Sequence, residues 1–191
     1  FRRVLFRSRD ESNPEQNQAY DDLKKAYAVT QAWANKLKTT LFPVGRVEIR
    51  KRPTNQGNHF SGCNWAKIYP SPEAPKELAI TVGIDADDGF VVKIDTVGLG
   101  ESSKTRKTYL ALRGDYYNAP FVTTMPAGDG LEKSLDQLTE WSAEAIRNFK
   151  LHYEELVAKM NLSKSLDDED LLKHFDSKPA FQTFRASWTP E

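Results

Sequence analysis

The chain has 191 residues, of which 39% are hydrophobic and 28% charged, and these values exclude a chain that is disordered throughout. Its 27 basic and 27 acidic side chains give no net charge, which argues against a general polyanion binder. A single cysteine, Cys63, excludes an internal disulfide framework, and no apolar run approaches the roughly 20 residues that cross a bilayer. We therefore expect a cytoplasmic protein without a membrane partner.

The two ends of the sequence differ from its middle. Residues 1–8 match the in-frame translation of a common sequencing-library adapter, so we expect them to be an artefact from an assembled environmental (metagenomic) read. Without Arg2, Arg3 and Arg7 the chain is slightly acidic, with a net positive part at 44–113 and a net negative part at 114–191. We expect 9–162 to be a single α+β domain of a larger prokaryotic protein, and 163–191 to be a short helix and the truncated start of a following segment.

The first predicted element is a long helix that begins after Asn13. Asn13 is a typical N-cap, Pro14 suits the first helical position, and Gln16 is placed to reach back as in a capping box. Apolar residues then recur every three or four positions until Pro43. The pattern predicts an amphipathic helix over about 14–42.

In the middle of the chain, apolar and polar residues alternate with a period of two. Alternating residues predict strands at 46–50, 65–69, 78–84, 90–97 and 106–113, with a hairpin turn at 85–89 in which Gly89 takes a positive φ. The connections are too short for helical crossovers, so an antiparallel sheet of four to five strands is expected. Asp129 and Glu132 then form a predicted capping box, and apolar residues recur at helical spacing from there to about 160. We expect one helix or two in succession, packed against the sheet face that carries Leu78, Ile80, Val82 and Ile84.

Residues 98–105 nearly match a phosphate-binding P-loop. The match fails because Ser103 stands where glycine is needed, and because the residues that follow alternate like a strand instead of opening a helix. A flexible connection explains the segment better than nucleotide binding.

Metal and catalytic motifs are also incomplete. The Asp85, Asp87 and Asp88 cluster lacks the glycine and glutamate positions of a calcium loop, and His59 with Cys63 has no second ligand pair at zinc spacing. No nucleophile motif occurs, and a nuclease would need an acid where Val91 stands. We expect no metal or cofactor, and these residues favour a non-catalytic domain while leaving enzymatic activity open.

The most informative segment is the loop at 50–65. It combines consecutive cations that suit phosphates, amides that suit base edges, and aromatic rings that suit stacking. The predicted nucleic-acid-binding residues are Arg50, Lys51, Arg52, Asn55, Gln56, Asn58, Phe60 and Trp65, with Lys104, Arg106 and Lys107 extending the patch across the sheet. A surface loop whose Trp65 packs into the core remains the structural alternative.

No known family is identified across 9–191. The leading hypothesis is a non-catalytic recognition domain that binds DNA or RNA through this loop. The first alternative is a protein-interaction or scaffold domain that docks another domain of the same protein through the acidic helices and the Trp188 end. The second is a metal-dependent hydrolase with Asp85, Asp87, Asp88 or Asp95 as ligands.

Overall fold

The computed structural model describes residues 8–55 and 57–162, and the expectations for 1–7 and 163–191 lie outside these ranges. In chain order the elements are α1 (Pro14–Leu41), β1 (Arg46–Ile49), β2 (Cys63–Tyr69), β3 (Leu78–Asp85), β4 (Gly89–Thr96), α2 (Lys104–Arg113), the 3-10 helix η1 (Tyr116–Asn118), β5 (Val122–Met125), α3 (Ala127–Leu131) and α4 (Leu135–Lys159). No helix in these described ranges is long and apolar enough to cross a membrane.

The five strands form one antiparallel sheet in the order β1-β2-β3-β4-β5. Neighbours in sequence are neighbours in the sheet. The expectation of uniformly short connections fails between β4 and β5, because α2 and η1 lie in that connection. The predicted hairpin joins β3 to β4, and Gly89 has the expected positive φ of 74°. The α+β class and the antiparallel sheet are thus confirmed.

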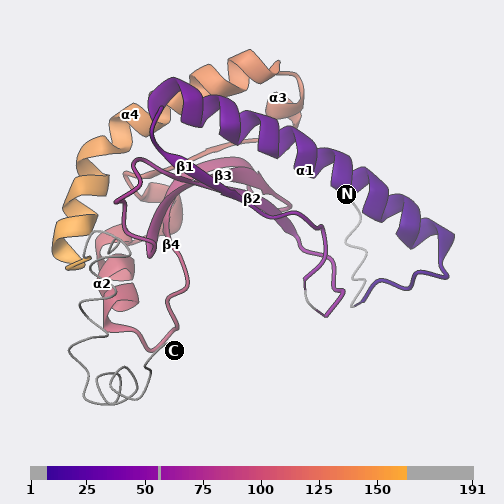
Figure 1. Ribbon diagram of the computed structural model, residues 1–191, viewed down its shortest axis with the longest axis horizontal. Coiled ribbons are helices and arrows are strands. Elements are labelled where there is room, and N and C mark those ends of the chain that lie inside the picture. The colour runs from indigo at the N-terminus through magenta and orange to yellow at the C-terminus, as the bar shows by residue number, and fades with distance from the viewer. Residues whose placement is uncertain (1–7, 56, 163–191) are drawn as a thin grey trace, which may run out of the picture.

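The long helices α1 and α4 lie on the same side of the sheet (Figure 1). Alternate residues of β3 and β4 point toward them and are fully buried, including Leu78, Val82 and Ile94. Trp33 and Leu37 of α1 and Phe149 of α4 enter the same core. This layer of helices on one face confirms the predicted arrangement and leaves the other face of the sheet without a described helix over its middle.

The start of α1 follows the sequence prediction in part. Asn13 Oδ1 accepts hydrogen bonds from the backbone N–H groups of Glu15 and Gln16 at 3.0 and 3.2 Å. The side chain of Gln16 does not close a capping box on Asn13, because its Oε1 accepts from the N–H of Asp10 at 2.6 Å. The side chains of Asn13 and Gln16 therefore define the helix entry together with the segment before it.

The strand predicted at 106–113 is wrong, because Lys104–Arg113 forms α2. Ser103 is the N-cap, and its Oγ accepts from the N–H of Arg106 at 3.4 Å. One reason given against a P-loop therefore fails, since a helix does open at Lys104; the serine in the glycine position still argues against it. The fifth strand is instead Val122–Met125, which pairs with β4.

The helical region after β5 contains two helices, one of the two predicted possibilities. The capping box belongs to Ser134 and Gln137 and not to Asp129 and Glu132: Gln137 N–H donates to Ser134 Oγ at 3.2 Å, and Ser134 N–H donates to Gln137 Oε1 at 2.8 Å. The short α3 therefore precedes a separately capped α4.

Candidate functional site on the helix-free face of the sheet

The loop singled out in the sequence contains an open hollow. Arg50, Arg52, Thr54, Asn55 and Gly57 line a depression of about 620 Å³ at one end of the molecule. The side chains of Arg50 and Arg52 are exposed there, as is that of the intervening lysine. The cations are therefore accessible, as the prediction requires.

The side-chain amides of this loop form hydrogen bonds that stabilise the loop. Asn55 Oδ1 accepts from the N–H groups of Gly57 and His59 at 2.9 and 3.0 Å. Asn58, with φ of 59°, donates from Nδ2 to the carbonyl of Arg9 at 3.0 Å. Gln56 lies outside the described residues. Asn55, which lines the hollow, and Asn58 therefore both stabilise the turn.

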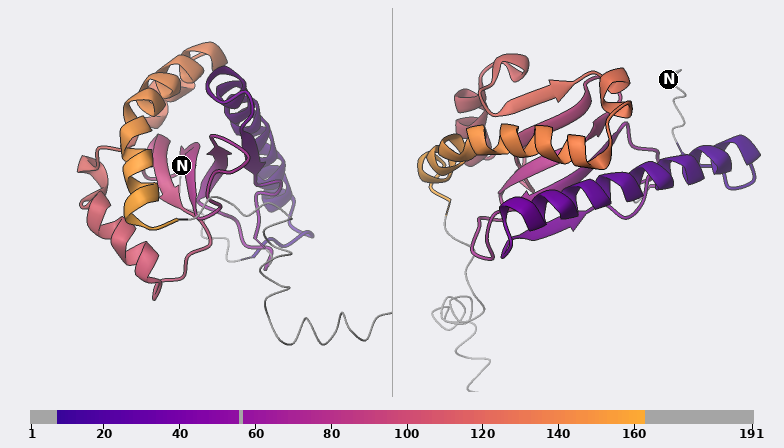
Figure 2. Two further views of the ribbon diagram at one scale, coloured as in Figure 1. Left: turned by 60° about the vertical axis from the view of Figure 1, so that its left-hand side comes forward. Right: turned by 90° about the horizontal axis from the view of Figure 1, so that it is seen from above.

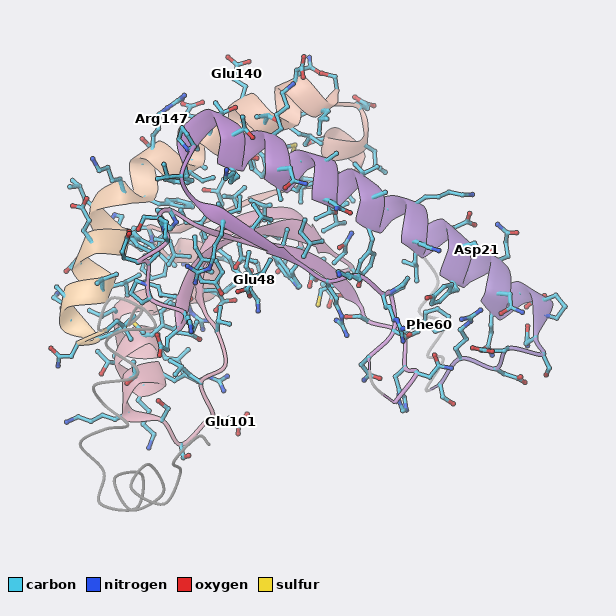
Figure 3. All side chains as sticks on the ribbon, viewed as in Figure 1. Asp21, Glu48, Phe60, Glu101, Glu140 and Arg147 are labelled. Atoms are coloured by element: carbon cyan, nitrogen blue, oxygen red, sulfur yellow. The ribbon has the colours of Figure 1, made fainter. Side chains whose placement is uncertain are left out.

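The structure separates the other predicted residues. Phe60 stays in the loop, where its backbone bridges to Thr54, but Trp65 lies within β2. Lys104, Arg106 and Lys107 belong to α2. Figure 3 shows Phe60 well apart from Glu101, which precedes α2. The α2 cations therefore do not extend the patch formed by the loop.

A second constellation lies on the side of the sheet opposite to α1 and α4, which we call the helix-free face. Its central row crosses the strands as Glu48, Lys67, Thr81, Lys93 and Val122. Figure 3 shows Glu48 on the side of the sheet away from α1. Neighbouring strands are about 5 Å apart, so Lys67 and Lys93 lie roughly 10 Å apart across Thr81.

Lys93 is a largely enclosed cation at the centre of this face. Its side chain is only 14% exposed, and its Nζ lies 2.7 Å from Asp95 Oδ2. The same nitrogen lies 4.5 Å from the ring centre of Trp65 and 5.3 Å from that of Tyr116. Both distances fall within cation–π range. An ammonium group is thus held between two aromatic rings with one carboxylate beside it.

Gly83 explains how the indole reaches Lys93. It pairs with Trp65 across β2 and β3, and a Cβ at this position would come within 2.8 Å of Trp65 Cε3. The absence of a side chain lets the indole lie across β3 toward β4. Gly83 is therefore part of the geometry of the site.

The β4 edge of the face is closed by α2 and η1. Arg113 lies 5.4 Å from the ring centre of Tyr116 and 5.9 Å from that of Tyr109. Tyr109 donates its hydroxyl to the carbonyl of Ile94 at 2.9 Å. Burial, followed by nearby carboxylates, raises the pKa of Tyr116 to about 12 and raises that of Tyr109 as well. Both rings stay neutral at physiological pH.

The β1 edge repeats this combination of cation and ring. Arg46 lies 3.9 Å from the ring centre of Tyr69, and the Tyr69 hydroxyl lies 3.3 Å from Glu48 Oε2. Burial, followed by the charge of Glu48, raises the pKa of Tyr69 to about 12. Lys67 Nζ lies 3.9 Å from the same carboxylate oxygen.

The face therefore offers four cations (Arg46, Lys67, Lys93 and Arg113) and a set of aromatic rings. Its carboxylates include Glu48 and Asp95, with Asp85 and Asp88 near Tyr116. Lysine and arginine bind anionic groups, and ring faces bind apolar or cationic groups. The arrangement suits a ligand that joins an anion to an apolar or aromatic part.

The carboxylates proposed for a hydrolase do not converge. Asp85 and Asp95 stand six register positions apart along β3 and β4, or roughly 20 Å. Asp85 Oδ1 accepts from the N–H groups of Asp87 and Asp88, and Asp88 accepts from the hydroxyl of Tyr117. Within 8–55 and 57–162, no three His, Cys, Asp or Glu side chains are grouped to hold a metal ion.

Sequence reasoning found Trp65 but not its partners Lys93, Tyr116, Arg113 and Lys67. One signal was available: Lys67 and Lys93 occupy polar positions of two alternating strands. Both pair with Thr81 of β3, so they lie on the same face of the sheet. The contribution of Arg113 was hidden, because 106–113 was predicted to be a strand, and Tyr116 was not assigned to any element.

Comparison with known proteins gives one partial similarity. The chain is 32% identical over 89 residues to flaviolin linalyltransferase from Streptomyces virginiae. The match covers 47% of this chain and 29% of that protein, so the chain spans less than a third of the relative's length. No protein-family model and no solved structure matches the chain.

Proposed function

We propose that the helix-free face binds a ligand in which an anion is joined to an apolar part, and that the chain is part of an enzyme that transfers an allylic group to an aromatic acceptor. The observation that carries the proposal is Lys93, held between Trp65 and Tyr116 at the centre of the face. The partial similarity to a linalyltransferase supports this type of reaction.

The chemistry of such a transfer matches the groups on the face. The bond from the allylic carbon to its leaving group breaks, and the electron pair stays on the leaving group. The allylic carbon then bonds to a ring carbon of the acceptor, which loses a proton to solvent. In this proposal Lys93 and Lys67 hold the anionic leaving group, while Trp65 and Tyr116, whose rings position the Lys93 ammonium, border the apolar part of the ligand.

A binding titration tests this assignment. The full chain is titrated with geranyl thiolodiphosphate, a non-reactive allylic diphosphate analogue, by calorimetry. We expect saturable binding that Lys93→Met weakens at least tenfold, because the substitution removes the enclosed charge. Lys104→Met is the matched control, since Lys104 is exposed on α2, and it should bind as the unmodified chain does.

Product analysis addresses the reaction itself. The chain is incubated with geranyl diphosphate and a dihydroxynaphthalene, and products are identified by mass spectrometry. A prenylated naphthalene that the Lys93→Met chain fails to form is the expected result. Failure of the titration, with no saturable binding or equal binding by Lys93→Met, would falsify the proposal.

The nucleic-acid recognition predicted from the sequence is the second candidate function. What favours it is the hollow lined by Arg50 and Arg52, beside the exposed Lys51. Filter binding with labelled single-stranded DNA and RNA at two salt concentrations tests it. Binding should weaken with salt and be lost when Arg50, Lys51 and Arg52 are replaced by alanine together. The same replacement of Lys104, Arg106 and Lys107 is the control, and binding that is insensitive to salt contradicts this candidate.

A further inference from the structure

An apolar groove lies on the helix-covered side of the sheet. It has a volume of about 420 Å³ and lies between the end of α1, the middle of α4 and the end of β2. Leu41, Phe42, Ile80, Ile146 and Phe149 supply most of its apolar lining. This volume falls at the lower end of the usual range for small-molecule sites.

The groove forms where α1 and α4 separate. The two helices pack closely at Trp33, whose ring stacks 6.4 Å from that of Trp141 and whose Nε1 donates to Ser142 Oγ at 3.0 Å. Beyond this contact they diverge toward their C-terminal ends (Figure 2, right). Side chains of the core, including Ile80 of β3, then become the floor of the groove.

The lining also carries charge. Arg147 and Lys150 are exposed, stand three residues apart and so lie on one face of α4. Figure 3 places Arg147 beside the C-terminal end of α1. Among the described residues neither cation forms an ion pair within 4.0 Å, and Glu154 is the one carboxylate in the lining. An apolar groove with two available cations suits an apolar chain with an anionic head.

We propose that this groove binds a single-chain amphiphile with a carboxylate head, such as a medium-chain fatty acid. The apolar chain lies against Leu41, Ile80 and Ile146, and the carboxylate faces Arg147 and Lys150. The site is separate from the helix-free face, because the sheet stands between the two. It therefore does not depend on the proposed transferase function.

Chain length and charge provide the test. The full chain is titrated calorimetrically with hexanoate, octanoate, decanoate and decanol. Because a buried methylene contributes about 0.8 kcal/mol, we expect affinity to rise about fourfold per methylene. Decanoate should bind more tightly than decanol, and it should shift the methyl NMR signals of Leu41, Ile80 and Ile146.

Charge reversal isolates the head group. The double variant Arg147→Glu with Lys150→Glu should weaken decanoate binding at least tenfold and leave decanol binding unchanged, whereas Arg147→Lys with Lys150→Arg should keep it. Lys104→Glu with Lys107→Glu is the control for net charge. The proposal is overturned if decanol binds as well as decanoate, if affinity does not depend on chain length, or if the shifted signals lie elsewhere.

Discussion

At the scale of single residues, the contact between Trp65 and Gly83 shapes the helix-free face. Gly83→Ala should lower the free energy of unfolding by about 1–3 kcal/mol, because the added Cβ meets the indole and the backbone carbonyl of Asn64. Urea unfolding followed by circular dichroism measures the change. Gly100→Ala is the control, since nothing lies within 4 Å of a Cβ there. Equal stability of the two variants would show that the contact is not tight.

The buried tyrosines predict a loss of stability in alkali. Burial raises the pKa of Tyr69, Tyr116 and Tyr153 to about 12. The folded chain therefore holds these protons more tightly than the unfolded chain, whose tyrosines titrate near 10. This contribution is complete below pH 10 and falls as the pH rises toward 12. Urea midpoints measured across this interval should decrease, and Tyr116→Phe should make the decrease shallower; midpoints that do not change would contradict the assignment.

The roles of individual residues could be predicted from the sequence only in part. The hairpin glycine Gly89 and the N-cap Asn13 were predictable, because each satisfies a local backbone requirement. The enclosure of Lys93 was not, because it depends on side chains from β2 and η1 that only tertiary packing brings together.

At the scale of elements, the capping box of α4 offers a clean test. Ser134→Ala should lower the free energy of unfolding by about 1 kcal/mol, since the first turn loses an acceptor for the N–H of Gln137. Thermal and urea unfolding measure the effect. Ser102→Ala replaces an exposed serine before α2 and should change stability little. A Ser134→Ala chain as stable as this control would mean that α4 does not need its cap.

The strands and the helix α2 show why some elements were predictable. Each of β2, β3 and β4 has seven or eight residues, long enough for alternation to be visible. The less exposed residues of α2 follow helical spacing: Thr105 and Leu112 are half-buried and Tyr109 is buried. Polar and apolar residues also alternate at the end of this segment, which is typical of a strand. The cap at Ser103 favours the helix. The strand β5 has four residues and was too short to recognise before its pairing with β4 was known.

At the scale of the whole molecule, the sheet separates two surfaces of different chemistry. The helices α1 and α4 cover one side of the sheet (Figure 1). That side holds the core and the apolar groove, and the helix-free side holds the cations and rings. The loop with Arg50 and Arg52 forms a third surface at one end. Ligands for the three surfaces should therefore bind without competing.

The measurement that bears most directly on the helix-free face is NMR of the chain with ¹⁵N-labelled tryptophan. The four tryptophans give separate indole signals, and Trp65→Phe identifies that of Trp65. Geranyl thiolodiphosphate should shift the Trp65 signal saturably while those of Trp33 and Trp141 stay in place, and Lys93→Met should abolish the shift at the same concentration. An unchanged Trp65 signal at concentrations that saturate the calorimetric titration would contradict the account.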